Sequence, residues 1–450
     1  MPDLLAARSQ MAVSLAFHIV FAEIGIAMPV LMVLAEWRWV RTGVPEYLEL
    51  AKRWAKGTAI LFAVGAVSGT VLSFELGLLW PGFMRWAGSI IGMPFSLEGF
   101  AFFTEAIFLG VYLYGWTRIP RRAHLAAGVL VAVSGLLSAI FVVIANAWMN
   151  SPRGFDLVGG EPTNVDPLAA MANPAAFSQT LHMSIAAYAA TGLAVAGIHA
   201  LLLLRRGGGT TLNRKALGIA LLVGAPAAVL QPVSGDVSAR FVAQWQPVKL
   251  AALEGQFETA RGAPLRIGGV PDESARVTRW AIEIPRGLSL LAFHDPNATV
   301  RGLEEFSPER WPPVVPVHFA FQVMVGLGTA MALVSLWAII AALRRRDLTT
   351  RRWLLRALVV VAPFGFLATE AGWMVTEIGR QPWIIQGVLL TRDAVTPMPG
   401  LIVPFLLFTL LYCGLGAIVV VLLVRQIVST PGTSISRRGD SAPDTAEATA

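Results

Sequence analysis

Nine separate apolar stretches, each long enough to cross a bilayer, dominate the sequence. A helix of about 20 apolar residues spans the hydrocarbon core, so this pattern predicts an all-α polytopic membrane protein. Charged residues make up only 14% of the chain, against about 25% in an average soluble protein, which excludes a set of soluble domains. We expect one membrane domain over residues 1–450, with transmembrane helices at 14–36, 58–79, 95–116, 124–148, 178–204, 216–234, 316–343, 356–376 and 398–424.

Lys and Arg gather in alternate loops between these stretches. Basic residues collect on the cytoplasmic side of membrane proteins, so we place the N-terminus outside and the C-terminus inside. The polar stretch 235–315 then lies outside the cytoplasm, and the tail 429–450 is expected to be a disordered cytoplasmic segment. The first apolar stretch has no small-residue cleavage site after it, so we expect no cleavable signal peptide. The basic residues of the inner loops are Arg38, Arg41, Lys52, Arg53, Lys56, Arg118, Arg121, Arg122, Arg205, Arg206, Arg214, Lys215, Arg344, Arg345, Arg346, Arg351, Arg352 and Arg356.

Charge and cysteine content exclude several other classes of protein. The formal net charge of +7 is explained by sidedness, so we expect no nucleic-acid partner. The single cysteine, Cys413, excludes an internal disulfide, a covalent CxxCH haem site and a cysteine-rich cluster site.

Ionisable side chains interrupt the apolar stretches. Such groups are costly inside a bilayer and usually carry function. Nearly all of them lie in the outer half of the predicted bundle, which a random scatter of polar residues would not produce. They are His18, Glu75, Glu98, Glu105, His182, Glu370 and Glu377, with Arg380 beside the last. Solvated or interfacial positions are expected for the other histidines, His124, His199, His294 and His318.

His182 and Met324 lie at similar depth in two helices that run in the same direction. His is the commonest axial ligand of non-covalent haem and Met is a frequent partner, so a haem held between these helices is one interpretation. Packing is the other, because most Met residues in membrane helices pack against neighbours. For His18, a cofactor role and a proton-transfer role are both open.

Two further pairs each share a helical face. Glu98 and Glu105 are seven residues apart, about 10 Å along a helix, which suits a proton relay or the ligation of iron. Ser138 and Asn146 are eight residues apart. They could carry a chain of hydrogen-bonded water, although helix–helix contact is the better interpretation of these residue types alone.

Lys249 and Glu254 lie on neighbouring faces of a helical pattern in the polar stretch. They could hydrogen-bond the head group of a quinol, but the residues alone favour a solvated amphipathic helix. A proton-coupled membrane transporter is the alternative function, because it would also use intramembrane His, Glu and Arg. We see no internal duplication, and the polar residues do not lie at the midplane.

Taken together, these segments resemble subunit I of the cytochrome bd quinol oxidases along almost the whole chain. The resemblance rests on SLAFHIVFAEIGIAMP, SLEGFAFFTEAIFLGVYLYGW, LSAIFVVIANAWMNSP, LHMSIAAY, VKLAALE, HFAFQVMVG and the most specific segment, EAGWMVTEIGRQPW. It implies a terminal oxidase of the bacterial cytoplasmic membrane that oxidises ubiquinol or menaquinol at the outer face and reduces O2 to water with cytoplasmic protons. It also implies a second large subunit and, as an optional partner, a small single-helix subunit.

The same resemblance implies roles for single residues. His182 and Met324 would hold the low-spin haem b. His18 and Glu98 would ligate two high-spin haems, haem b and haem d, and which residue serves which haem is open. The implied proton-route residues are Glu105, Ser138 and Asn146. The remaining implied positions are Lys249 and Glu254 at the quinol site, and Trp373, Glu377 and Arg380 beside the haems.

Three departures from the family pattern favour its short-loop, cyanide-insensitive branch. The polar stretch has no large insertion in its C-terminal half, and Gln322 stands where many members have Arg. The gap between Glu98 and Glu105 is one residue tighter than in some members. In this branch, a further haem b is the alternative to haem d.

Overall fold

The computed structural model describes residues 1–205 and 211–428, so the predicted tail 429–450 and Arg206 lie outside the described residues. Within this part of the chain, nine helical spans are long and apolar enough to cross a membrane, which confirms the prediction. They are α1 (Asp3–Thr42), α2 (Pro45–Leu79), α3 (Pro81–Tyr114), α4 (Arg121–Asn150), α6 (Ala176–Arg205), α7 (Thr211–Trp245), α10 (Val314–Leu343), the pair α11 (Arg352–Val361) and α12 (Phe364–Ile378), and α14 (Ile402–Val428).

Several helices extend well beyond the apolar stretch that predicted them. α1 and α7 are both longer than the expected 14–36 and 216–234, because helices continue past the hydrocarbon core into polar surroundings. Local signals set the ends instead. Gly43 ends α1 in the left-handed conformation, with a φ of 68° and its N–H donated to Trp39 O, as glycine commonly does after a helix. Pro45 and Pro81 open α2 and α3, where a missing N–H costs nothing.

The eighth span is broken, which the apolar stretch 356–376 did not predict. Pro363 lies between α11 and α12, and proline removes a backbone donor and clashes with the preceding turn. The break packs closely on α6. A Cβ added to Gly197 would lie 2.4 Å from Ala362 Cβ, and one added to Gly365 would lie 2.3 Å from Ala190 Cα. Small residues therefore let this span and α6 approach each other.

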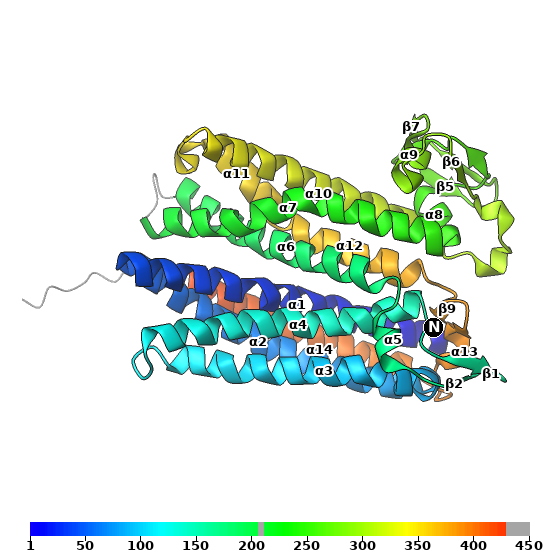
Figure 1. Cartoon of the computed structure of the whole chain (residues 1–450), viewed down its shortest axis with the longest axis horizontal. Coiled ribbons are helices and arrows are strands. Elements are labelled where there is room, and N and C mark those ends of the chain that lie inside the picture. Colours follow the sequence, from blue (N-terminus) through cyan, green and yellow to red (C-terminus); the bar gives the residue numbers. More distant parts are fainter. Residues whose placement is uncertain (206–210, 429–450) are drawn as a thin grey trace, which may run out of the picture.

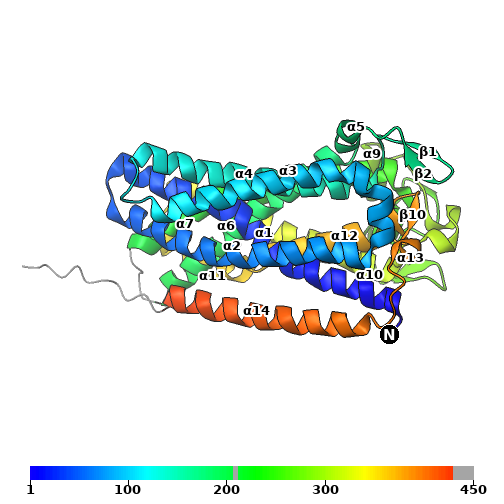
Figure 2. The same ribbon diagram turned by 90° about the horizontal axis from the view of Figure 1, so that it is seen from below.

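The helices form two groups that lie side by side (Figure 1). One group contains α1–α4 and α14, the other contains α6, α7 and α10–α12, and both α1 and α4 contact α6 across the boundary. Figure 2 shows α14 at the edge of the bundle, where it packs on α1 and α2. A buried apolar cluster between α6, α7, α10 and α11 forms the core of the second group.

Residues 235–315, here called the long loop, contain more structure than predicted. They begin with the last turns of α7 and include α8 (Pro247–Glu254), α9 (Gly287–Phe293), η1 (Leu303–Glu305) and η2 (Pro308–Arg310). Three antiparallel strand pairs complete the loop. They are β3 (Ala260–Arg261) with β8 (Thr299–Val300), β4 (Leu265–Ile267) with β7 (Ile282–Ile284), and β5 (Val270–Asp272) with β6 (Val277–Arg279). The all-α prediction thus holds for the spans and not for this loop.

The long loop and the N-terminus lie at the same end of the bundle (Figure 1). The short elements at this end are α5 (Pro167–Met171), α13 (Thr391–Ala394), β1 (Asp156–Val158), β2 (Glu161–Thr163), β9 (Trp383–Ile385) and β10 (Leu389–Leu390). The basic connections between α1 and α2, α3 and α4, and α10 and α11 lie at the opposite end (Figure 1). η3 (Leu348–Thr350) belongs to the last of these connections.

Candidate functional site

His182 lies on α6 and its ring faces α7. Its Nδ1 atom is 2.9 Å from the Ser234 hydroxyl, and the Gln231 amide nitrogen is 3.2 Å from its Nε2 atom. A Cβ added to Gly235 would lie 3.5 Å from the Cε1 atom of the ring. The histidine is therefore held by polar groups one turn apart on α7, beside a glycine.

Met324 lies on α10 and its thioether faces α12. A Cβ added to Gly372, the residue before Trp373, would lie 3.1 Å from Met324 Sδ. His182 and Met324 thus have different immediate neighbours, and no hydrogen bond or ring contact joins them among the described residues. The two helices that carry them, α6 and α10, both pack on α7 and α12. The two predicted axial ligands therefore lie near the same pair of helices but do not contact each other.

His18 lies in the other helix group and faces α2. Its Nδ1 atom is 3.0 Å from Ser68 Oγ. A Cβ added to Gly69, the next residue of α2, would lie 3.0 Å from His18 Cε1. Like His182, this histidine is held by a hydroxyl and lies against a glycine.

Glu98 and Glu105 both face α4, as their shared helical face predicts. Ser138 Oγ donates to Glu98 Oε1 at 3.3 Å, so the serine contacts a carboxylate in addition to joining two helices. Glu105 is buried, and its Oε1 atom would lie 3.0 Å from a Cβ added to Gly135. The α3–α4 pair therefore brings three of the predicted proton-route and ligand residues together.

The arrangement around these residues fits a bound haem. Glycine is used where a backbone must approach a ligand closely. Imidazole nitrogen, thioether sulfur and carboxylate oxygen are all ligands that bind iron in proteins. In each case a side chain with a possible iron-binding atom faces a glycine. The pairs are His182 with Gly235, Met324 with Gly372, His18 with Gly69 and Glu105 with Gly135.

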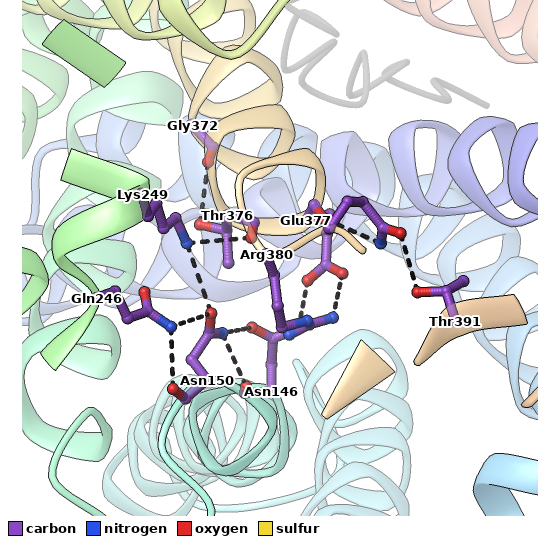
Figure 3. A network of polar contacts seen from close by, with 10 residues as sticks. Asn146, Asn150, Gln246, Lys249, Gly372, Thr376, Glu377, Arg380 and Thr391 are labelled. Carbon is purple, nitrogen blue, oxygen red and sulfur yellow. Dashed lines mark hydrogen bonds and ion pairs between the residues drawn. The ribbon is translucent and has the colours of Figure 1, made fainter. Parts of the chain in front are cut away.

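A network of polar contacts joins α4 to α12 (Figure 3). Asn146 Nδ2 donates to Glu377 Oε1 at 2.6 Å, and Arg380 Nη2 donates to Glu377 Oε2 at 2.5 Å. Arg380 is only 2% exposed, and its Nε and Nη1 atoms have no hydrogen-bond partner among the described residues. Unpaired guanidinium donors in a buried position suit a carboxylate-bearing ligand, such as haem with its propionates.

The same network continues into the long loop (Figure 3). Asn150, one turn after Asn146, donates to the Asn146 carbonyl at 3.1 Å. Lys249 Nζ on α8 lies 3.5 Å from Asn150 Oδ1 and 3.2 Å from the Thr376 carbonyl. Gln246, just before α8, donates to the Asn150 carbonyl at 2.9 Å. Residues from the loop, α4 and α12 therefore form one connected cluster.

Lys249 and Glu254 are 4% and 3% exposed, so the solvated amphipathic helix is the wrong interpretation. Burial lowers the pKa of Lys249 to about 7, with Arg380 lowering it further and Glu377 opposing. Burial raises the pKa of Glu254 to about 8, against the effect of Arg266. Both groups therefore titrate near neutral pH, where a group that exchanges protons with a substrate works best.

A solvated position is the wrong prediction for three of these four histidines, whereas an interfacial position stays a prediction. His124 is 2% exposed, with its Nδ1 atom 2.8 Å from Glu36 Oε1. His199 and His318 are also buried, while His294 is exposed as expected. Buried polar groups are hydrogen-bonded, and the partners come from other helices and loops that are distant in the sequence.

Sequence reasoning missed Asn150, Gln246 and Glu23. Asn150 lies four residues after Asn146 on the same helical face, a spacing that was available as a signal. Glu23 is an ionisable residue in the first apolar stretch, and both of its buried carboxylate oxygens lack a hydrogen-bond partner among the described residues. Gln246 carries no signal, because its burial depends on the path of the loop.

Comparisons with known proteins agree along almost the whole chain. The family described as cytochrome bd terminal oxidase subunit I matches residues 6–431. The putative cytochrome bd menaquinol oxidase subunit I of Bacillus subtilis (strain 168) is 38% identical over 437 residues, which cover 96% of this chain and 98% of that protein. The cytochrome bd ubiquinol oxidase subunit 1 of the same organism is 32% identical over 441 residues, covering 95% and 94%.

A solved structure gives the same result. The bd oxidase from Geobacillus thermodenitrificans superposes with a TM-score of 0.90 at 37% sequence identity, covering 95% of this chain and 99% of that chain. The nine spans and the intramembrane His, Met and Glu residues are thus found in a fold that matches the relatives throughout. The chain therefore belongs to the cytochrome bd terminal oxidase subunit I family, whose members are multi-span membrane oxidoreductases of the respiratory chain.

Proposed function

We propose that this chain takes electrons from quinol at the end of the bundle that carries the long loop, and that oxygen is reduced to water on haems in the same half of the bundle. The terminal oxidase function itself, and work alongside a subunit II, follow from the family. The proposed locations of quinol oxidation and oxygen reduction are supported by one observation, the connected cluster from Lys249 to Glu377 and Arg380. It links the long loop to α12, the helix that faces Met324.

The proposed haem ligands are His182 and Met324 for a low-spin haem b, and His18 and Glu98 for two high-spin haems. The high-spin haems are haem b and haem d, or a further haem b in place of haem d. When bound, haem supplies the iron that carries electrons and reacts with oxygen. Trp373, the residue after Gly372, is proposed to lie beside the low-spin haem, and the Arg380 donors left unpaired among the described residues would bind haem carboxylates.

Lys249 and Glu254 form the proposed quinol site. With pKa values of about 7 and about 8, the amine and the carboxyl group both exchange protons near neutral pH. Glu254 Oε2 has no hydrogen-bond partner among the described residues, so it is free to accept the proton of a quinol hydroxyl. Either ubiquinol or menaquinol offers that hydroxyl.

Glu105, Ser138 and Glu98 form the proposed proton route through the α3–α4 pair. Ser138 already donates to Glu98, and carboxyl and hydroxyl groups pass protons along such hydrogen bonds. Asn146 orients Glu377 at the far end of the route. Protons taken from the cytoplasm must cross most of the bilayer to reach this site, and each charge moved is worth about 2.3 kcal/mol per 100 mV. The reaction then builds a membrane potential without a separate pump.

The proposed setting is the bacterial cytoplasmic membrane, with the N-terminus and the long loop outside and the C-terminus inside. The basic connections at the opposite end of the bundle support this orientation. A small single-helix subunit is proposed as an optional partner beside subunit II. The tail 429–450 is proposed to be a disordered cytoplasmic segment, and residues 1–450 to be a single membrane domain.

The quinol site is tested by Lys249→Met in the assembled oxidase. We expect the KM for quinol to rise at least about tenfold, since a buried charge-assisted contact is removed. Oxygen uptake driven by an artificial electron donor that bypasses the quinol site should not change. Lys56→Met, at an exposed lysine in the opposite end of the bundle, is the matched control. An unchanged quinol KM in the Lys249 variant would remove the basis of the proposed site.

The haem ligands are tested by a reduced-minus-oxidised optical spectrum. His182→Ala should remove the low-spin haem b signal together with quinol oxidation, because the iron loses an axial ligand. His199→Ala, at another buried histidine of the same helix, should keep both. The wild-type spectrum also reports whether haem d or a further haem b is bound.

A further inference from the structure

His318 lies near the start of α10, and its ring contacts two backbone carbonyl groups of the long loop. It belongs to none of the proposed haem, quinol or proton-route sites. Its side chain is 0% exposed. The Nδ1 atom is 2.7 Å from the Leu253 carbonyl oxygen, and the Nε2 atom is 3.2 Å from the Gly268 carbonyl oxygen. One ring therefore bridges two segments of the long loop.

Both partners of the ring are hydrogen-bond acceptors. A carbonyl oxygen carries no hydrogen, so each carbonyl group can only accept a hydrogen bond from the ring. The shorter contact, at 2.7 Å, is to the carbonyl oxygen of Leu253, which lies next to Glu254.

The two carbonyl groups belong to functionally placed segments. Leu253 is the residue before Glu254 at the end of α8, and Gly268 follows β4. Gln322, one turn after His318 on the same face of α10, accepts from the Gly268 N–H at 3.1 Å and donates to the Arg266 carbonyl at 3.0 Å. α10 thus holds both the end of α8 and the end of β4.

The same helix carries Met324, six residues after His318. The contacts of His318 therefore fix the distance between the quinol-site carboxyl group of Glu254 and the helix that supplies a proposed haem ligand. A site residue that is held by buried hydrogen bonds to a helix is positioned more precisely than a residue on an unsupported loop.

We propose that His318 is a positioning residue of the quinol site, which clamps Glu254 and the β4 end of the long loop to α10. This inference rests on the proposed function, since it assumes that quinol binds beside Glu254. Loss of the clamp frees α8 and weakens quinol binding, while the haem ligands and the oxygen-reducing side are untouched. The effect is therefore expected in KM and not in the rate driven by other donors.

The test compares three substitutions at this one position in the assembled oxidase. The amide nitrogen of Asn stands near the position of the histidine Nδ1 atom, and that of Gln stands near Nε2. His318→Asn therefore keeps the contact with Leu253, His318→Gln keeps the contact with Gly268, and His318→Leu keeps volume but removes both. His294→Leu, at an exposed histidine of the same loop, is the matched control.

Oxygen uptake is measured with a soluble quinol and with an artificial donor that bypasses the quinol site. We expect His318→Leu to raise the KM for quinol at least about tenfold, with an unchanged artificial-donor rate and haem spectrum. His318→Asn should recover most of the wild-type KM, because it holds the carbonyl next to Glu254, and His318→Gln should recover less.

Two results would overturn the clamp. One is a quinol KM near the wild-type value in His318→Leu with a normal haem spectrum. The other is an equal loss of the quinol and artificial-donor rates. If the oxidase does not assemble with His318→Leu, the Asn and Gln variants test the clamp instead. A wild-type quinol KM in both of these variants would also overturn the clamp. A failure of the proposed quinol site is recognised separately, because Lys249→Met would then leave the quinol KM unchanged.

Discussion

Asn146 on α4 donates a hydrogen bond of 2.6 Å to Glu377 on α12. The second carboxylate oxygen of Glu377 accepts from Arg380 at 2.5 Å, so both oxygens are held by side chains. The Arg380 contact is local, because the two residues lie three apart, whereas Asn146 comes from the other helix group and holds the carboxylate between the two groups. The orientation of Glu377 therefore depends on the neutral amide of Asn146, which donates a hydrogen bond only when its nitrogen faces the carboxylate.

Asn146→Ala should lower the quinol-driven rate of oxygen uptake by about 10- to 100-fold, the worth of one hydrogen bond to a charged group. Asn146→Asp should be more severe, since it places a second carboxylate against Glu377. Oxygen uptake is measured on preparations of equal haem content. Ser134→Ala is the control on the same helix, because the Ser134 hydroxyl donates to backbone carbonyls of α4. Equal activity of the Asp and Ala variants would argue against a fixed carboxylate here.

Glu254 should give the quinol reaction a dependence on pH. Burial raises its pKa to about 8, so it is mostly protonated at pH 7, and its carboxylate fraction grows as the pH rises through about 8. If the carboxylate accepts the quinol proton, kcat/KM for quinol rises over this range and then levels off. Glu254→Gln cannot ionise and should lose the rise.

The control for this profile is Asp272→Asn in the same loop. Hydrogen bonds from Ser274 and the Ala275 N–H hold the pKa of Asp272 at about 2, so this group stays ionised throughout and its variant should follow the wild type. Lys249 titrates near pH 7 and remains in the Glu254 variant, so the difference between the two profiles isolates Glu254. A rise that persists in Glu254→Gln would assign the titration to another group.

The nine spans were predictable because hydropathy is a local property of about 20 residues. The break at Pro363 was signalled by the proline, although Pro29, Pro94, Pro226 and Pro232 lie inside unbroken helices. Close packing on α6 does not separate them either, because Gly224 beside Pro226 approaches α6 closely as well. A proline alone therefore does not predict where a span breaks. Family membership decides between the oxidase and the transporter interpretation, which residue types alone did not.

The site was predictable in its residue types and not in its surroundings. Lys249 looked like a solvated lysine because its burial arises from Asn150 on α4 and from α12, where a Cβ added to Gly379 would lie 2.8 Å from the lysine Cε. The burial of His318 was not predictable for the same reason, since its partners lie 65 and 50 residues away in the chain. Long-range contacts of this kind set burial and pKa, and a single sequence does not contain them.

A buried pair at the basic end of the bundle should contribute to stability. His124 Nδ1 lies 2.8 Å from Glu36 Oε1, and both side chains are almost fully buried. Glu36→Leu leaves the histidine nitrogen without a partner, which costs about 1–3 kcal/mol, so the midpoint of thermal unfolding should fall. The double variant Glu36→Leu, His124→Leu should recover part of the loss, because the imidazole and the carboxylate are then both replaced by apolar side chains.

The comparison for this pair is Glu49→Ala, which removes a partly exposed ion pair with Arg53 on α2. Exposed pairs contribute about 0–1 kcal/mol, so its unfolding midpoint should stay close to that of the wild type. If Glu36→Leu shifts the midpoint no more than Glu49→Ala does, the buried pair is not a stabilising element.

Gly372 should be essential to the low-spin haem site, because its missing side chain is what makes room for Met324. A Cβ added there would lie 3.1 Å from Met324 Sδ, closer than the 3.5–4.0 Å or so of an ordinary contact, and would push the thioether away. Gly372→Ala should therefore reduce the low-spin haem b signal and lower quinol-driven oxygen uptake by about tenfold, as changes next to metal ligands commonly do. Gly218→Ala on α7 is the matched control, since a Cβ there meets nothing within 4 Å. A Gly372→Ala enzyme with a normal low-spin spectrum would show that the position of the Met324 thioether does not depend on this glycine.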